Sequence, residues 1–337
     1  MNITSAEAHR LFRFVSIIFG HLTLVSSALA QHYWPGLEGI RAATTPPPGI
    51  YLRDYNAFTY DEHNYNTLLP QTPFPPISPY SSVQTDVKQT SYLNEPRLIW
   101  ITNLKLLGAD YGMALIVPFG YVKNEYSTPA QFVPTFPPVI LPPSHFTLDR
   151  FGLGDVEFEP LLLGWHFKHF DFTAGYGIWA PTGDFDANTT ANIGLGCWSH
   201  MITAGATWYP DDARSWAVSV LNHYEINQEQ EQTGVTYPQV FTMEWGVSKS
   251  VFRNVDIGIV GYWSEQLTDY NGGPVSSPSD SFAIGPEISA SFPKLGLAAS
   301  LRYLHAFQEM TWQNIPHTGA TSDIEGNKVV LTLTKQF

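Results

Sequence analysis

The sequence predicts an all-β fold, a transmembrane antiparallel β-barrel of about 12 strands. Three observations lead to this prediction. Apolar and polar residues alternate along most of the chain, which places them on opposite faces of a strand. The links between the predicted strands are alternately short and long. Charged residues make up only 14% of the chain and aromatic residues another 14%, whereas soluble domains carry about 25% charged residues.

Residues 1–30 have the three parts of a secretory signal peptide. Two arginines form a basic start, an apolar run covers residues 14–25, and Ala28-Leu29-Ala30 supplies small residues for cleavage. We therefore expect a mature chain that begins at Gln31. A membrane anchor is the alternative, but the apolar run is too short to span a bilayer as a helix.

Residues 31–48 contain Trp, Pro and Gly and lack the alternation of a strand. We expect a fixed, irregular segment that either enters the barrel lumen as a small plug or lies at the periplasmic rim. The sequence does not decide between these two placements. Residues 49–337 would form the barrel itself.

The barrel region divides into runs with the period of a strand. In one run, Phe282, Ile284 and Ile288 alternate with small or polar residues. Most runs have the length of about 9–11 residues that a tilted membrane strand needs, while strands of soluble proteins have about 5–6. We predict strands near residues 49–60, 92–107, 109–123, 151–167, 169–182, 196–208, 214–226, 236–250, 255–267, 282–292, 295–309 and 327–337.

The lengths of the predicted links alternate regularly, which is not expected of a soluble β-sandwich. Short turns alternate with long links, as in transmembrane barrels, whose periplasmic turns are short and whose outer loops are long. Both chain termini would then lie on the periplasmic side. We expect the long links at residues 61–91, 124–150, 183–195, 227–235, 268–281 and 310–326.

The strand ends agree with a barrel in a membrane. Several Trp and Tyr residues lie near predicted strand ends, and such amphipathic rings favour the headgroup region. The last strand carries Val329, Leu331 and Leu333 on one face and ends in Phe337. This ending resembles the signal that the outer-membrane barrel-assembly machinery reads, so we expect this machinery, outer-membrane lipid and lipopolysaccharide as partners.

Several classes of function are disfavoured. The formal net charge is −13 with only 17 Lys and Arg residues, so no basic stripe for nucleic acid is expected. Cys197 is the only cysteine and cannot form an intrachain disulfide. Ser199 and His200 are adjacent and would point to opposite faces of a strand, so they do not form a catalytic dyad. We expect no enzyme activity, no cofactor and no metal site.

Ten charged residues fall on the polar faces of the predicted strands. A charge that faces lipid is costly, so we expect these side chains in the lumen. They would either select ions or form structural ion pairs in a narrow barrel, and the sequence favours neither. The candidate lumen-lining residues are Arg97, Lys105, Asp155, Glu157, Glu159, Asp171, Glu244, Asp256, Glu287 and Arg302.

Two proline-rich stretches, residues 70–79 and 129–143, also carry many apolar side chains. Proline favours a stiff, extended backbone, and a fully solvated loop gains nothing from apolar residues. We expect these long links either to form an apolar capture surface over the barrel mouth or only to pack on each other. The candidate residues of this surface are Phe74, Tyr80, Phe132, Phe136 and Phe146.

Three motifs resemble a known family. They are the opening from His32 to Tyr51, the strand start Gly152-Leu153-Gly154-Asp155, and the strand end from Tyr176 to Gly183. The chain is similar, over about residues 31–337, to the family named for the meta-pathway of phenol degradation. The resemblance implies an outer-membrane transporter and brings no catalytic residues with it.

These observations together predict a passive channel in a Gram-negative outer membrane for uptake of small, hydrophobic or aromatic molecules. A first alternative is a non-conducting barrel with a binding or structural role at the surface. A second alternative is an outer-membrane lipid hydrolase, in which neighbouring strands would have to bring Ser, His and an acid together.

Overall fold

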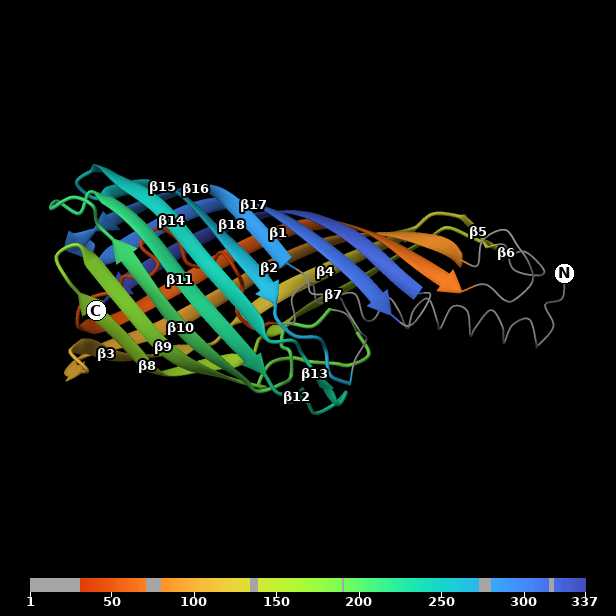
Figure 1. Ribbon diagram of the computed structural model, residues 1–337, viewed down its shortest axis with the longest axis horizontal. Helices are drawn as coiled ribbons and strands as arrows, with labels where there is room; N and C mark the ends of the chain where they lie inside the picture. Colours follow the sequence, from red (N-terminus) through yellow and green to blue (C-terminus); the bar gives the residue numbers. More distant parts are fainter. Residues whose placement is uncertain (1–30, 71–79, 134–138, 190, 273–279, 315–317) are drawn as a thin grey trace.

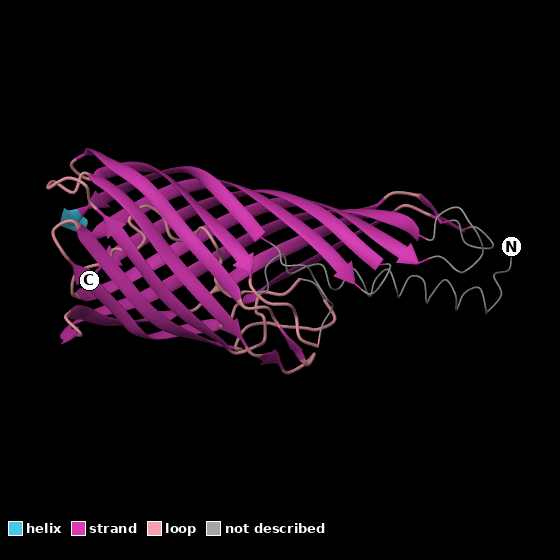
Figure 2. Ribbon diagram, viewed as in Figure 1, coloured by secondary structure: helices cyan, strands magenta, loops and turns pink. Residues whose placement is uncertain are grey.

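The computed structural model describes residues 31–70, 80–133, 139–189, 191–272, 280–314 and 318–337, so the expected signal peptide lies outside the described residues. The described chain is almost entirely β-structure (Figure 2). It contains no helix long and apolar enough to span a membrane. The elements are β1 (Gly49–Pro70), β2 (Tyr80–Leu106), β3 (Ala109–Ile116), β4 (Phe119–Thr128), β5 (Gln131–Val133), β6 (Val139–Leu141), β7 (Ser144–Leu153), β8 (Val156–His166), β9 (Phe170–Ala180), β10 (Ser199–Trp208), β11 (Trp216–Asn227), β12 (Glu229–Gln230), β13 (Val235–Thr236), β14 (Val240–Phe252), β15 (Val255–Gln266), β16 (Asp280–Phe292), the 3-10 helix η1 (Pro293–Leu295), β17 (Leu297–Asn314) and β18 (Thr318–Gln336).

One antiparallel sheet closes on itself to form a barrel (Figure 1). Its order is β1-β18-β17-β16-β15-β14-β11-β10-β9-β8-β3-β2-β4-β7, and β1 also pairs with β2. β3 and β4 both pair with β2, one after the other, and together form one interrupted strand of the barrel. β7 and β8 pair with β4 and β3 and form the next interrupted strand. The barrel therefore has 12 strands, the number that the sequence predicts.

The two interrupted strands are broken at neighbouring positions in the sheet. Pro118 separates β3 from β4 and has no N–H for the ladder. Gly154, in the break between β7 and β8, donates its N–H to the Pro118 carbonyl at 2.8 Å. This bond satisfies a main-chain group that the broken ladder would otherwise leave unpaired.

The two ends of the barrel differ. At one end, which we call the turn end, short links join β2 to β3, β8 to β9, β10 to β11, β14 to β15 and β16 to β17. The C-terminus lies there as well, because the Phe337 N–H donates to the Ile50 carbonyl at the start of β1 at 3.0 Å. At the opposite, loop end, the described residues 181–189, 191–198, 228–239 and 267–272 belong to longer links.

Some predicted loops are wrong. β1, β2, β17 and β18 continue through most of residues 61–91 and 310–326, and β4 and β7 extend into 124–150. Figure 1 shows these strands reaching past the rest of the barrel. The sequence there is polar at successive positions, as in Asp61-Glu62-His63-Asn64, so the apolar alternation that marks a half-buried strand disappears. The main-chain ladder nevertheless continues.

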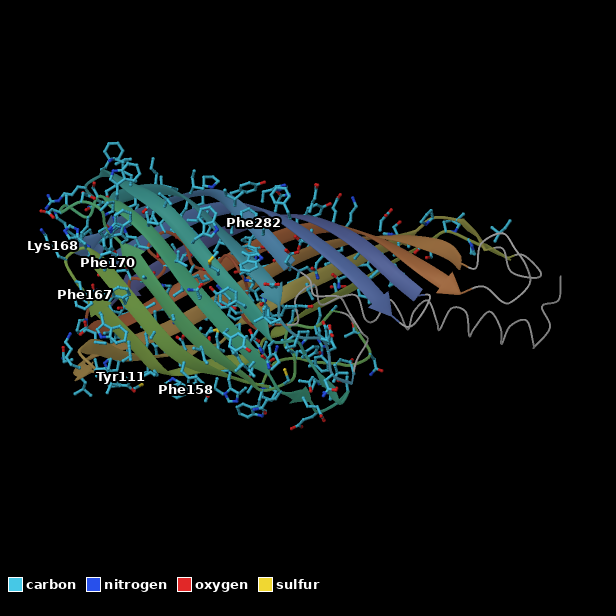
Figure 3. The ribbon with its side chains drawn as sticks, in the orientation of Figure 1. Tyr111, Phe158, Phe167, Lys168, Phe170 and Phe282 are labelled. Carbon is cyan, nitrogen blue, oxygen red and sulfur yellow. The ribbon has the colours of Figure 1, made fainter. Side chains whose placement is uncertain are left out.

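Large apolar side chains cover the outside of the barrel, while many charges lie inside. Phe58 is 56% exposed and its neighbour Ala57 is fully buried; Trp100 is 50% exposed and Ile99 only 1%. In Figure 3, Phe158, Phe170 and Phe282 lie on the outer surface. A water-soluble protein shows the reverse distribution.

Candidate functional site: the barrel lumen

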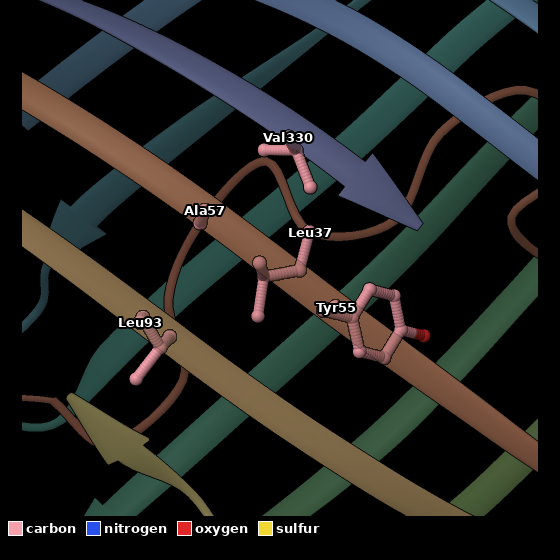
Figure 4. Close-up of a cluster of buried hydrophobic side chains, with 5 residues drawn as sticks. All are labelled: Leu37, Tyr55, Ala57, Leu93 and Val330. Carbon is pink, nitrogen blue, oxygen red and sulfur yellow. The ribbon is translucent and has the colours of Figure 1, made fainter. Parts of the chain in front are cut away.

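The N-terminal segment, residues 31–48, runs inside the barrel. Leu37 is 2% exposed and packs with Tyr55, Ala57, Leu93 and Val330 on the inner faces of β1, β2 and β18 (Figure 4). Gln31, His32 and Tyr33 are buried as well. The structure thus places the segment in the lumen rather than at the rim, the two placements that the sequence left open.

Lumen carboxylates hold the backbone of this segment. An irregular segment has N–H groups without a strand or helix partner, and such groups need an acceptor when buried. Carboxylates supply strong, charge-assisted acceptors. The backbone donors and their acceptors are His32 and Tyr33 with Glu225, Gly36 and Glu38 with Glu244, and Ile40 with Glu287.

His32 connects the loop end of the segment to two lumen carboxylates. Its Nδ1 lies 2.9 Å from Glu225 and its Nε2 lies 2.9 Å from Asp155. The ring stacks on Trp179 with a centroid distance of 5.1 Å. Burial alone would lower the pKa of His32, but the hydrogen bonds and charges of Asp155 and Glu225 outweigh it and raise the pKa to about 9. His32 is therefore protonated at neutral pH and donates to both carboxylates.

Buried cations also bind the backbone of the N-terminal segment. Arg302 donates to the carbonyls of Gly36 and Leu37 and lies 3.2 Å from Glu287. Lys328 donates to the Pro35 carbonyl at 2.6 Å.

Glu38, in the segment, lies between two guanidinium groups. Its carboxylate is 3.4 Å from Arg53 and 3.3 Å from Arg97. Burial would raise the pKa of Glu38, but these two cations outweigh it and lower the pKa. Glu38 is consequently ionised, and the segment carries its own negative charge into the lumen.

Two cavities flank the segment. The larger has a volume of about 400 Å³ and opens toward the loop end, where Phe185, Tyr237 and Tyr270 line it. The smaller, about 60 Å³, reaches Thr44 on the other side. Both are lined by Tyr33, Glu95 and Trp179, so these three residues mark the boundary between the cavities. The larger cavity has the size of common small-molecule sites, about 300–1,000 Å³.

A family model described as "Putative MetA-pathway of phenol degradation" matches residues 73–313. The chain belongs to this family. The resemblance seen in the sequence is thereby confirmed. No curated protein matches the sequence.

One solved structure shows the same fold as this member of the phenol-degradation family, and a second one is less similar. An outer membrane channel from Pseudomonas putida F1 is 14% identical, with a TM-score of 0.54; the match covers 88% of this chain and 98% of that one. A FadL homologue from Pseudomonas aeruginosa is 8% identical, with a TM-score of 0.44, and the match covers 86% of this chain and 90% of that one. The first of these supports the assignment of the fold.

Most of the predicted lumen residues of this phenol-degradation family member are buried within the barrel. Arg97 contacts both Glu38 and Glu159. Asp171, which is fully buried, lies beside Tyr209 and Arg214. The Arg97 side chain is 13% exposed, and the buried members of the predicted set are Asp155, Glu157, Glu159, Asp171, Glu244, Glu287 and Arg302.

Two predicted lumen residues, Lys105 and Asp256, lie near the turn end and are more exposed than the rest of the set. The Lys105 side chain is 61% exposed and contacts Asp110. A register shift between Ile101 and Lys105 breaks the alternation on which its placement depended. Asp256, at the start of β15, is 23% exposed and lies 3.4 Å from Arg41 of the segment.

The predicted capture surface stays a prediction. Phe74 and Phe136 lie outside the described residues, and Tyr80 and Phe132 belong to β2 and β5. Phe146 stacks on Tyr126 with a centroid distance of 4.7 Å.

Sequence reasoning missed His32, Glu225 and Lys328. Glu225 falls on the polar face of the predicted strand 214–226 and could have been found by the same alternation as Glu244. His32 belongs to a segment with no period, so no pattern points to it. In the described part of the chain, no group of three or more His, Cys, Asp and Glu side chains could hold a metal ion.

Proposed function

We propose that this protein is a passive outer-membrane channel for uptake of small, hydrophobic or aromatic molecules. The observation that carries the proposal is the aromatic-lined cavity of about 400 Å³ inside the barrel, which meets a second cavity of the lumen at Tyr33. A solute that enters from the loop end would pass along the N-terminal segment toward the turn end. Such flux follows the gradient and needs no cofactor.

The apolar outer surface supports a place in a membrane. Side chains such as Phe58, Ile259 and Leu301 are about half exposed, at 56%, 54% and 49%, and hydrocarbon would remove this surface from water. In this proposal residues 1–30 direct export and are cleaved. The final strand is read by the barrel-assembly machinery, and lipid and lipopolysaccharide surround the barrel.

The comparisons support the choice of solute. The family is named for phenol degradation, and the structure from Pseudomonas putida F1 is that of an outer membrane channel. A channel that supplies such a pathway would have to admit aromatic molecules across the outer membrane.

A non-conducting barrel is the second candidate. The N-terminal segment fills much of the lumen, and the cavity on its turn-end side measures only about 60 Å³. The lipid hydrolase has no comparable support. The Ser199 hydroxyl donates to Asn227, while His200 contacts Tyr176 and Gln228.

Uptake by whole cells separates the first two candidates. Cells with an intact lipopolysaccharide layer, with and without the gene, are given micromolar radiolabelled phenol, a long-chain fatty acid or a small sugar acid. We expect the gene to accelerate phenol uptake several-fold and to leave sugar-acid uptake unchanged. Equal phenol uptake with and without folded protein would favour the non-conducting barrel.

Two matched variants locate the path. Ser91 is 6% exposed and lines the larger cavity, so Ser91→Trp would fill that cavity and slow phenol uptake. Ile259, on the outer surface, is 54% exposed, so Ile259→Trp would leave uptake unchanged. Uptake that Ser91→Trp does not slow would place the path outside this cavity.

A further inference from the structure

The larger cavity has a polar corner where β1 meets β18. Lys328 lies opposite Thr59 in the register of the two strands, and Asp61 lies opposite Gly326, two residues away. Because residues i and i+2 of a strand share a face, the side chains of Thr59, Asp61 and Lys328 all point the same way, and all three line the cavity. We call these three residues the Lys328 corner.

The corner has unused hydrogen-bonding capacity. Lys328 is only 7% exposed, and of its three N–H donors one is directed at the Pro35 carbonyl. Among the described residues, no ion pair within 4.0 Å joins Lys328 to Asp61, although the two charges attract each other. The Thr59 hydroxyl is buried without a partner in the same part of the molecule. A buried polar group without a partner is destabilising, so a ligand that supplies the partner gains affinity.

The backbone is adapted to the position of Asp61. A Cβ atom on Gly326 would lie 1.8 Å from the Asp61 carboxylate. The carboxylate can therefore lie over the β1–β18 pair only because residue 326 has no side chain. This packing directs one acceptor and one cationic donor to the same corner of the cavity.

Aromatic rings surround the corner. The Lys328 ammonium lies 5.6 Å from the centre of the Trp34 ring and 5.5 Å from that of Tyr262. Tyr237 and Tyr270 line the same cavity. A flat ring in this space would have apolar contacts, while a polar atom attached to it could reach the corner.

We propose that the Lys328 corner binds the hydroxyl group of a neutral phenolic molecule. The phenolic oxygen accepts a hydrogen bond from the Lys328 ammonium, and the hydroxyl donates to the Asp61 carboxylate. The ring lies among the aromatic side chains of the cavity. This inference rests on the proposed channel function and names the class of solute that the channel would select.

Two other classes of solute fit the corner less well. An aromatic hydrocarbon would exclude water from Lys328, Asp61 and Thr59 without replacing its hydrogen bonds. An aromatic carboxylate would meet Asp61, Glu95 and Asp155, which all line the cavity. The other lining cation, His32, is already paired with Asp155 and Glu225. A neutral hydroxyl satisfies both charges of the corner and adds none.

Binding to the purified, folded protein tests the corner. The protein is held in amphipol, and quenching of tryptophan fluorescence is titrated with phenol, toluene and benzoate, with empty amphipol subtracted. Phenol and toluene have nearly the same size and differ in one hydroxyl. We expect phenol to bind roughly tenfold more tightly than toluene, because only phenol can form hydrogen bonds with Lys328 and Asp61.

Variants assign the effect to the corner. Lys328→Met keeps the length of the side chain and should remove most of the preference for phenol, and Asp61→Asn should reduce it several-fold. In the described part of the chain, Asp61 forms no hydrogen bond or ion pair with residues 31–48, whereas Lys328 donates to Pro35 of that segment. Asp61→Asn therefore tests the corner even where Lys328→Met disturbs the segment. Lys335→Met, near the end of β18 with an exposed side chain, is the matched control and should retain the preference.

Three results would overturn the proposal. They are equal binding of phenol and toluene by the unchanged protein, a preference for benzoate over phenol, and a phenol preference that survives both corner variants. A different result would contradict the channel proposal: phenol would bind selectively to the purified protein, but the protein would not accelerate phenol uptake by cells. Conversely, if the protein accelerates uptake but shows no preference for phenol in binding, the proposed role of the Lys328 corner is wrong and the channel proposal stands.

Discussion

At the scale of single residues, lumen charges bind the protein's own N-terminal segment. Glu225, Glu244 and Glu287 accept backbone N–H groups, and Arg302 and Lys328 donate to carbonyl groups. The sequence offered two interpretations of such charges, ion selectivity or structural pairing. Their contacts agree with a structural role for these residues. Their main partner is the backbone of the N-terminal segment and not a charged side chain on another strand.

His32 predicts a dependence of stability on pH. Its pKa is raised from 6.5 to about 9 because Asp155 and Glu225 outweigh the effect of burial. A raised pKa means that the contact contributes fully below about pH 6.5 and is lost as the pH rises through about 9. We expect the thermal midpoint of the unchanged protein to exceed that of His32→Gln most at pH 6 and to match it by pH 10.

The size of this effect follows from burial. His32→Gln leaves two buried carboxylates without their cation, and breaking a buried pair costs about 3–5 kcal/mol. A difference between the two proteins that does not change from pH 6 to pH 10 would show that His32 is not the titrating group. Ile259→Trp, on the outer surface, is the control and should follow the unchanged protein at every pH.

At the scale of elements, alternation predicts the strands well where one face is apolar. The run from Phe282 to Phe292 is predicted and observed as β16 almost residue for residue. Alternation fails where both faces are polar, as beyond Tyr60 in β1, because pairing there depends on main-chain hydrogen bonds that leave no pattern in the side chains. It also carries no information about residues 31–48, whose position depends on charges from distant strands.

The β16–β17 pair gives a prediction for one glycine. A Cβ on Gly285 would lie 1.7 Å from the Tyr303 carbonyl oxygen, and backbone cannot yield as a side-chain end can. We expect Gly285→Ala to destabilise the barrel by about 1–3 kcal/mol, measured as a lower thermal midpoint. Gly175→Ala, whose Cβ would have its nearest neighbour at 3.3 Å, should have a much smaller effect; equal losses would contradict the close approach of β16 and β17.

At the scale of the whole molecule, the barrel and the segment have separate roles. The wall supplies an apolar outer surface and a lumen with many charges, and the segment divides that lumen into two cavities of about 400 and 60 Å³. The number of strands and the closed sheet could be predicted from the sequence. The division of the lumen could not, because it depends on contacts such as His32 with Glu225, which are 193 residues apart.

The central claim is that solutes pass through the lumen and that residues 31–48 limit this path. Single-channel conductance in planar bilayers tests it most directly, comparing the unchanged protein with a variant that lacks residues 33–46, after both are shown to be folded by their heat-dependent gel mobility. We predict small, steady conductance steps for the unchanged protein and steps several-fold larger for the deletion variant, because water and ions would fill the space of the segment. Equal conductance of the two proteins, or none from either, would contradict the account.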